Sequence, residues 1–142
     1  MRTIKFRGKR IDNGEWVFGY FYRPNDGEEC YIKNIDFAIE TNHEVYKKTV
    51  SQFIGICDKS GKEIYGRDLV KAKRGNTSLG DMNDIYEIVW HDEYACFCYK
   101  CVKSDNFYRV GKIAESRSHP FFVTPKITEI IGNSFEHPNL LK

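Results

Sequence analysis

Short apolar stretches separated by turn residues run along the whole chain, and many of them have a period of two residues. Residues 4–7 read Ile-Lys-Phe-Arg, an alternation that predicts a strand with one solvent-facing side. Residues 15–22 follow a turn signal at Asp12-Asn13-Gly14 and are apolar on both faces of an extended strand, which predicts a central strand packed on both sides. Gly19 in this strand predicts a close approach of a neighbouring backbone or bulky side chain. Further strands are predicted at residues 30–32, 35–39, 69–74, 84–90, 94–99, 121–123 and 127–131.

The most strongly patterned stretch is residues 49–71. An apolar run at residues 53–57 meets the turn Asp58-Lys59-Ser60-Gly61, and a second apolar patch at residues 64–65 follows. Aspartate at the first turn position and glycine at the last suit a type I turn, so the stretch predicts a hairpin. A tighter turn at residues 66–68 then leads into a third strand.

Together these patterns predict an all-β fold with little helix. The frequent turns and the 15% aromatic content favour a barrel-like or strongly curved antiparallel sheet. A length of 142 residues, with 41% hydrophobic and 30% charged residues, fits one globular domain over residues 1–142. Near the C-terminus, Pro138–Leu141 is predicted to form a turn or a single turn of helix.

Four blocks of sequence carry a resemblance to a known family. They are R-x-I-K-F-R-G-K-R at residues 2–10, N-G-E-W-V-F-G-Y at 13–20, the hairpin at 49–71, and I-I-G-N-S-F-E-H-P-N-L-L at 130–141. In this order they resemble the YopX family, whose members are encoded by phages and prophages of Gram-positive bacteria. The family usually reads Y-E-G-D where this chain reads Tyr65-Gly66-Arg67-Asp68. The resemblance implies a fold and a phage origin, and no assigned activity.

The cysteines and the absence of long apolar runs bear on location and on metal binding. No run reaches the roughly 18–20 apolar residues of a membrane helix, and the N-terminus lacks the apolar core of a signal peptide. Five cysteines without a secretion signal predict reduced thiols in a cytoplasm, that of the host for a phage product. Cys96, Cys98 and Cys101 raise the alternative of a zinc site, but the second ligand pair is missing, and on one regular strand Cys98 and Cys101 face opposite sides. We therefore predict no bound metal.

No set of residues predicts catalysis. His91-Asp92 is the nearest to a catalytic or metal dyad, but it falls where a polar turn between two strands is expected. No serine lies in a G-x-S-x-G setting, and no glycine-rich loop opens onto a helix. The prediction is a protein that is not an enzyme and has no cofactor.

Three classes of function follow, in order of preference. The first is a non-enzymatic phage or prophage accessory protein that works through protein contacts and self-association, because so many aromatic side chains exceed what one small core can hold. The second is a nucleic-acid-binding β-barrel in phage replication or regulation, with Lys71, Lys73 and Arg74 at a strand end and an aromatic ladder on residues 15–22 as candidate contacts. These cations also fit a solvated edge strand, whose lysines discourage unwanted pairing. The third is an unrecognised enzyme. The net charge of +2 does not favour nucleic acid.

Overall fold

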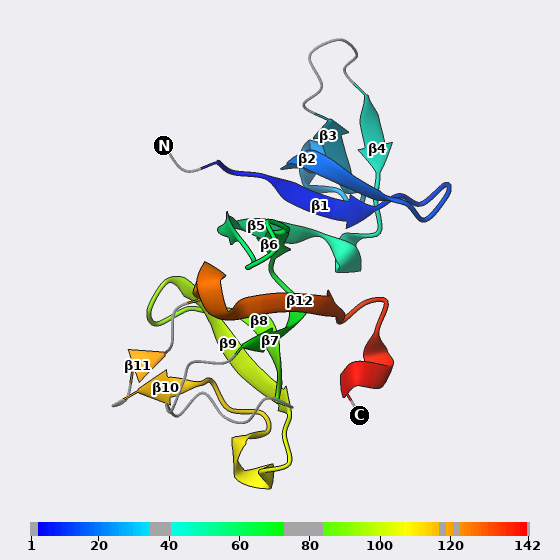
Figure 1. The fold of residues 1–142 in the computed structure, drawn as a ribbon. Helices are drawn as coiled ribbons and strands as arrows, with labels where there is room; N and C mark the ends of the chain where they lie inside the picture. The colour runs from blue at the N-terminus through cyan, green and yellow to red at the C-terminus, as the bar shows by residue number, and fades with distance from the viewer. Residues whose placement is uncertain (1–2, 35–40, 73–83, 117–118, 121–122, 142) are drawn as a thin grey trace. The chain divides into compact units, whose positions relative to one another are not determined.

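The structure is a computed structural model that describes residues 3–34, 41–72, 84–116, 119–120 and 123–141. Its contacts divide the chain into two compact units, Met1–Gly55 and Ile56–Lys142. Strands dominate in both, and helical structure in the described residues is limited to single 3-10 turns (Figure 1). The predicted all-β class with little helix is confirmed.

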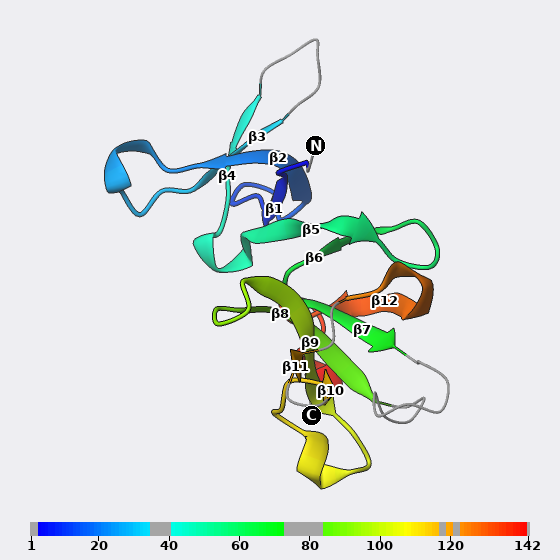
Figure 2. The ribbon, with the colours of Figure 1, turned by 90° about the vertical axis from the view of Figure 1, so that its left-hand side faces the viewer.

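The first sheet has the strand order β4-β3-β2-β1-β5-β6, and β5 crosses the boundary between the units (Figure 2). Hairpin β1–β2 contains the predicted turn, where Gly14 has a φ of +72°. The strands of this sheet are β1 (Phe6–Lys9), β2 (Trp16–Tyr22), β3 (Tyr31–Asn34), β4 (Asn42–Glu44), β5 (Ser51–Cys57) and β6 (Glu63–Tyr65).

One face of the first sheet forms the core of the N-terminal unit. Cys30, Ile32 and Val45 are buried there, and Phe6, Val17, Phe21 and Val50 pack against them. Gly19 of β2 lies against β3, where a Cβ atom would come within 1.9 Å of the Lys33 carbonyl oxygen. The predicted close approach at this glycine is therefore confirmed.

The second sheet has the order β12-β7-β8-β9, and a separate pair of short strands, β10 and β11, follows β9. Tyr99 of edge strand β9 and Thr128 of edge strand β12 share a hydrogen bond of 2.5 Å between their hydroxyl groups. A flat sheet would put these edges about 14 Å apart, so the sheet is strongly curved. Its strands are β7 (Asp68–Ala72), β8 (Ile85–His91), β9 (Cys96–Lys103) and β12 (Thr128–Asn133), and the short pair is β10 (Glu115–Ser116) with β11 (His119–Pro120).

The expectation of one barrel-like sheet needs correction. The described strands lie in two main sheets of open order, so a closed barrel is not confirmed, although the curvature of the second sheet agrees with part of the prediction. The single domain over residues 1–142 stays a prediction. The strand predicted at 35–39, most of the one at 121–123, and the end of the one at 69–74 lie outside the described residues. The C-terminal helical turn is confirmed as a 3-10 turn at Pro138–Leu141.

The predicted hairpin at residues 53–65 forms strands β5 and β6, and its turn is closed by an aspartate. Asp58 is buried and accepts hydrogen bonds through Oδ1 from the backbone N–H groups of Ser60 (2.8 Å) and Lys62 (3.0 Å) and from the Ser60 hydroxyl (2.7 Å). Its Oδ2 accepts from the backbone N–H of Ile130 in β12 (3.1 Å). One carboxylate therefore holds the turn together and fastens it to the second sheet.

The next turn contains an arginine in the left-handed region. Arg67 has a φ of +67°, at the position where the YopX pattern has glycine. Its guanidinium lies 4.7 Å from the ring centroid of Phe135, and its Nε donates to Glu87 (3.3 Å) and Ser134 (3.2 Å). These contacts offset the strain of about 1 kcal/mol or more that a side chain meets at this φ.

Candidate functional site

A row of aromatic side chains lies on the face of β2 opposite to the core. Trp16, Phe18, Tyr20 and Tyr22 occupy alternate positions of this strand, so all four point to the same side of the sheet. Phe18, Tyr20 and Tyr22 are 41%, 53% and 38% exposed. The prediction that β2 is packed on both faces is therefore wrong. One face is core, and the other carries accessible rings.

The strands on both sides of β2 place basic residues beside these rings. Directly opposed residues of an antiparallel pair share a face of the sheet. On β1, Lys9 opposes Trp16 and Arg7 opposes Phe18. On β3, Lys33 opposes Tyr20 and Tyr31 opposes Tyr22. We call this surface the aromatic–basic face; it comprises Lys5, Arg7, Lys9, Trp16, Phe18, Tyr20, Tyr22, Tyr31 and Lys33.

Cations and rings are in contact across β1 and β2. The guanidinium carbon of Arg7 lies 4.8 Å from the Trp16 ring centroid, and Lys9 Nζ lies 5.9 Å from the same centroid. Lys5 Nζ lies 5.6 Å from the centroid of Phe18. Arg7 is buried, and its Nε donates to the Ser51 hydroxyl at 3.0 Å. Arg7 therefore orients Trp16, while the half-buried Lys5 and Lys9 supply charge nearer the surface.

The tyrosines form the other end of the face. Tyr22 and Tyr31 are stacked, with ring centroids 5.4 Å apart and planes inclined by 20°. The Tyr31 hydroxyl donates to Glu29 at 3.0 Å, and this hydrogen bond raises the pKa of Tyr31, so the phenol stays neutral. A shallow hollow of about 370 Å³ is lined by Tyr20, Tyr22, Lys33 and Asn42. Flat rings, a hollow and a lysine thus lie together on one sheet surface.

The basic residues singled out in the sequence lie elsewhere in the chain. Lys71 is exposed on β7, opposite Glu129 of β12, so an acidic neighbour faces it across the strand pair. Lys73 and Arg74 lie outside the described residues. Their role in nucleic-acid binding stays a prediction. The alternation at residues 4–7 predicted a strand with one solvent-facing side, but it did not predict that its basic residues lie beside the rings of β2, because that position depends on the pairing of β1 with β2.

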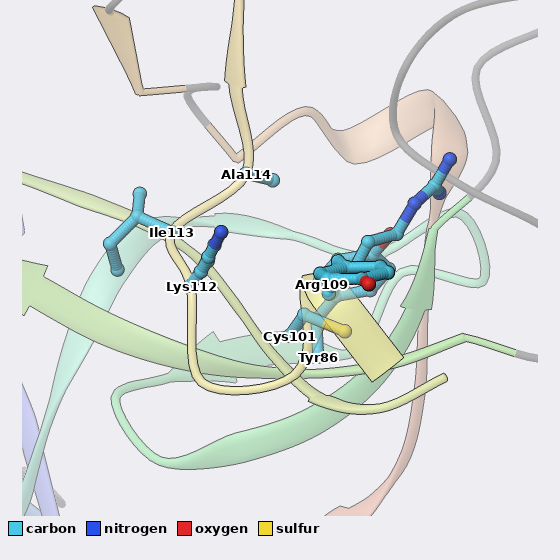
Figure 3. Close-up of a pocket in the computed structure, with 7 residues that line it drawn as sticks. Tyr86, Cys101, Arg109, Lys112, Ile113 and Ala114 are labelled. Carbon is cyan, nitrogen blue, oxygen red and sulfur yellow. The ribbon is translucent and has the colours of Figure 1, made fainter. Parts of the chain in front are cut away.

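A second hollow, of about 220 Å³, lies in the C-terminal unit (Figure 3). Tyr86 of β8 and Cys101 of β9 line it from the sheet, and the segment after β9 provides the remaining walls. Burial, followed by the charge of Asp84, raises the pKa of the Cys101 thiol, so this cysteine stays protonated and unreactive at neutral pH. Its lining residues are Tyr86, Cys101, Tyr108, Arg109, Lys112, Ile113 and Ala114.

The residues considered for metal binding or catalysis form no such centre in the described part of the chain. Cys96, Cys98 and Cys101 lie on the single strand β9, which begins two residues later than the strand predicted at 94–99 and extends beyond it, and all five cysteines have free thiols. Over the described ranges, no group of three or more His, Cys, Asp or Glu residues is placed to hold a metal ion. His91 ends β8 and packs on Tyr94, 5.1 Å between ring centroids, so the His91-Asp92 pair does begin a turn.

Fold and site together define an antiparallel β protein whose first sheet has one core face and one aromatic–basic face. Residues 5–142 match the YopX family, described as YopX protein, and the chain belongs to this family. The crystal structure of protein EF1440 from Enterococcus faecalis is similar in fold, with a TM-score of 0.51, 17% sequence identity, and 100% of both chains covered. No curated protein matches the chain. In the described residues, no helix has the length and apolar character to cross a membrane.

Proposed function

We propose that this YopX protein acts by binding and not by catalysis, and that the aromatic–basic face binds single-stranded nucleic acid. The observation that carries the proposal is the exposed row Phe18, Tyr20 and Tyr22, flanked on the same face by lysines of β1 and β3. Bases of any identity can stack on such rings, and lysines at the margins can contact the phosphates. The surface therefore suits unpaired strands and predicts little sequence preference.

The contribution of each part can be given a size. Loss of one stacking ring costs about 1–3 kcal/mol, which is roughly 5- to 150-fold in affinity. Lys5, Lys9 and Lys33 provide up to three phosphate contacts, so the slope of log affinity against log salt is expected to be about −2 for a single strand. A duplex hides its base faces and is expected to bind more weakly than a single strand.

Fluorescence anisotropy with labelled oligo-dT and oligo-rU of about 15 nucleotides tests the proposal. Tyr20→Ala should reduce the affinity roughly 5- to 150-fold without changing the slope of log affinity against log salt. Lys33→Gln should reduce the magnitude of the slope by about 0.7. Tyr94→Ala is the matched control, because Tyr94 is also exposed (38%) but lies in the C-terminal unit. If the wild-type protein binds no single strand at low salt, or if Tyr20→Ala and Tyr94→Ala behave alike, the proposal is wrong.

A second candidate function is protein interaction through self-association. A specific observation favours it, because exposed aromatic side chains also occur away from the aromatic–basic face. Trp90 is 46% exposed beside Phe97, with ring centroids 5.1 Å apart, near the turn between β8 and β9. Clustered rings of this kind are enriched in protein interfaces, and a symmetric dimer is the simplest product. Light scattering that gives 16.7 kDa at all concentrations would exclude this candidate.

The biological setting is part of the proposal. We propose that the protein acts in the host cytoplasm, either in replication or regulation or by binding a phage or host protein, and the phage or prophage origin that the family resemblance implies supports this proposal. Capture from infected cells, scored separately for nucleic acid and for protein, tests this setting. Recovery of a protein partner that survives nuclease treatment would favour the second candidate over the first.

A further inference from the structure

The spacing of the rings on the aromatic–basic face limits how a nucleic-acid strand can lie on it. Phe18, Tyr20 and Tyr22 occupy every second position of β2, so the backbone positions that carry them are about 6.5–7 Å apart along the strand. Across the strands, the ring centroids of Tyr22 and Tyr31 are 5.4 Å apart. Successive bases of a stacked nucleic-acid strand are only about 3.4 Å apart. In neither direction does the spacing of the rings match that of stacked bases.

The sheet fixes this spacing. Residues 16–19 of β2 pair with β1 and residues 19–22 pair with β3, so the backbone that carries the rings is held along its whole length. Tyr22 is also held by its stacking on Tyr31. A bound strand must therefore adapt to the protein. If each of its bases is to lie on a ring of its own, neighbouring bases must separate from one another.

The charges beside the rings favour a strand that runs along β2. Lys5 and Lys9 lie next to Phe18 and Trp16, where they can contact phosphates that follow the strand. A strand that crossed from β2 toward β4 would meet carboxylates, because Glu44 opposes Tyr31 and Glu29 accepts a hydrogen bond from the Tyr31 hydroxyl. Phosphates are repelled there. The course along β2 is also the one in which the rings are farthest apart.

The hollow beside Tyr20 gives a separated base a place to lie. Tyr20 is 53% exposed, the largest value in the row, and it lines the hollow of about 370 Å³ together with Tyr22, Lys33 and Asn42. The amide of Asn42 can both donate and accept, and the edge of every base offers a donor or an acceptor, so this contact selects no particular base. Base composition therefore matters mainly through the strength with which each base stacks on its neighbours.

We propose that the aromatic–basic face selects single strands whose bases stack weakly on one another, namely runs of thymine or uracil, over runs of adenine. This preference presupposes the nucleic-acid binding proposed above and adds to it. Adenines in a run are stacked in the free strand, and that stacking is lost when each base moves to its own ring. Thymine and uracil runs have little stacking to lose, so more of the energy of base–ring contact remains as affinity.

Fluorescence anisotropy with the full-length protein and labelled oligo-dT and oligo-dA of about 15 nucleotides tests the preference. We expect oligo-dT to bind about tenfold more tightly than oligo-dA at the same salt concentration. Equal affinities, or tighter binding of oligo-dA, would overturn the preference and leave the proposed function intact. Binding of neither strand would overturn both.

The circular dichroism of oligo-dA tests the mechanism without any variant. The band of stacked adenines should decrease when oligo-dA is saturated with protein, because the bases separate to reach the rings. An unchanged band would mean that the adenines stay stacked on the surface, and the inference would be wrong.

Variants at Tyr20 test the role of the ring spacing. Tyr20→Ala leaves Phe18 and Tyr22 as stacking rings about 13–14 Å apart, so adjacent bases need no longer separate, and the preference for oligo-dT should fall to about threefold or less. Tyr20→Phe keeps the ring and should keep both the affinity and the preference. Tyr94→Ala, in the C-terminal unit, is the control and should change neither. If Tyr20→Ala weakens both strands equally, the preference comes from base identity and the inference is wrong.

Discussion

Asp58→Asn is the substitution that most directly tests how the hairpin and the second sheet are joined. Asp58 is buried, and its carboxylate accepts four hydrogen bonds, three at Oδ1 and one at Oδ2. Asparagine keeps one oxygen for the donors of Ser60 and Lys62. Its amide nitrogen then faces the backbone N–H of Ile130, where two donors meet and neither has an acceptor. The change preserves shape and removes the acceptor that β12 requires.

The electrostatic part of this interaction can be sized from the pKa. Burial raises the pKa of Asp58, but hydrogen bonds from Ser60, Ile130 and Lys62 outweigh it and lower the pKa from 3.8 to about 2. The lower pKa of Asp58 in the folded state corresponds to roughly 2–3 kcal/mol of stability. Because the folded-state pKa is the lower one, this stability is fully present above about pH 4 and is lost as the pH falls toward 2. We expect Asp58→Asn to cost about 2–4 kcal/mol at pH 7.

Urea denaturation followed by tryptophan fluorescence measures the effect. The chain has two tryptophans, so a Trp16→Phe background leaves Trp90 as the reporter for the unit that contains Asp58. Asp58→Asn should lower the urea concentration at the midpoint of unfolding. Between about pH 4 and pH 2, the variant should lose less stability than the parent protein. Asp92→Asn, at an exposed turn position, is the control and should change stability by less than about 0.5 kcal/mol. A cost below about 1 kcal/mol at pH 7, or the same acid sensitivity in both proteins, would refute the reasoning.

Two further substitutions test the sheets. Tyr99→Phe removes the hydroxyl that pairs with Thr128 and accepts from the Thr124 backbone N–H (3.0 Å). Thermal denaturation should therefore show a free energy of unfolding lower by about 1–2 kcal/mol. An unchanged melting temperature would contradict the curvature assigned to the second sheet. Gly19→Ala places a Cβ within 1.9 Å of the Lys33 carbonyl oxygen. Urea denaturation should therefore show a free energy of unfolding lower by roughly 3 kcal/mol or more. A variant as stable as the parent would exclude the close approach of β2 and β3.

Local features of the sequence are sufficient to predict most strands and turns. The alternation at residues 4–7, the turn Asp12-Asn13-Gly14 and the hairpin at residues 53–65 all appear in the structure, with strand ends shifted by one or two residues. These predictions succeed because the two-residue period and the turn preferences of Asp, Asn and Gly depend on neighbours in the chain. Gly19 is predictable in the same way, since a glycine within a strand often marks a close approach of another backbone.

The candidate sites depend on contacts that no local pattern contains. Both faces of residues 16–22 are apolar in sequence, and only the pairing of β2 with β1 and β3 shows which face receives Cys30, Ile32 and Val45 and which remains exposed. The same pairing brings Lys9 and Lys33 to the rings. In the C-terminal unit, Asp84 and Arg109 meet across 25 positions of the chain.

The class of the fold, the family and the position of the turns could be predicted before any contact was known, because period, turn chemistry and motif order are properties of the chain. The tertiary structure decided that the strands lie in two main sheets, that the aromatic side of β2 is exposed, and that Asp58 joins its hairpin to β12. These features follow from tertiary contacts, because the burial of a side chain depends on which strands pair and on what covers each face of the sheet. An aromatic residue satisfies the same local pattern in a core and on a binding surface, and only its distant neighbours distinguish the two.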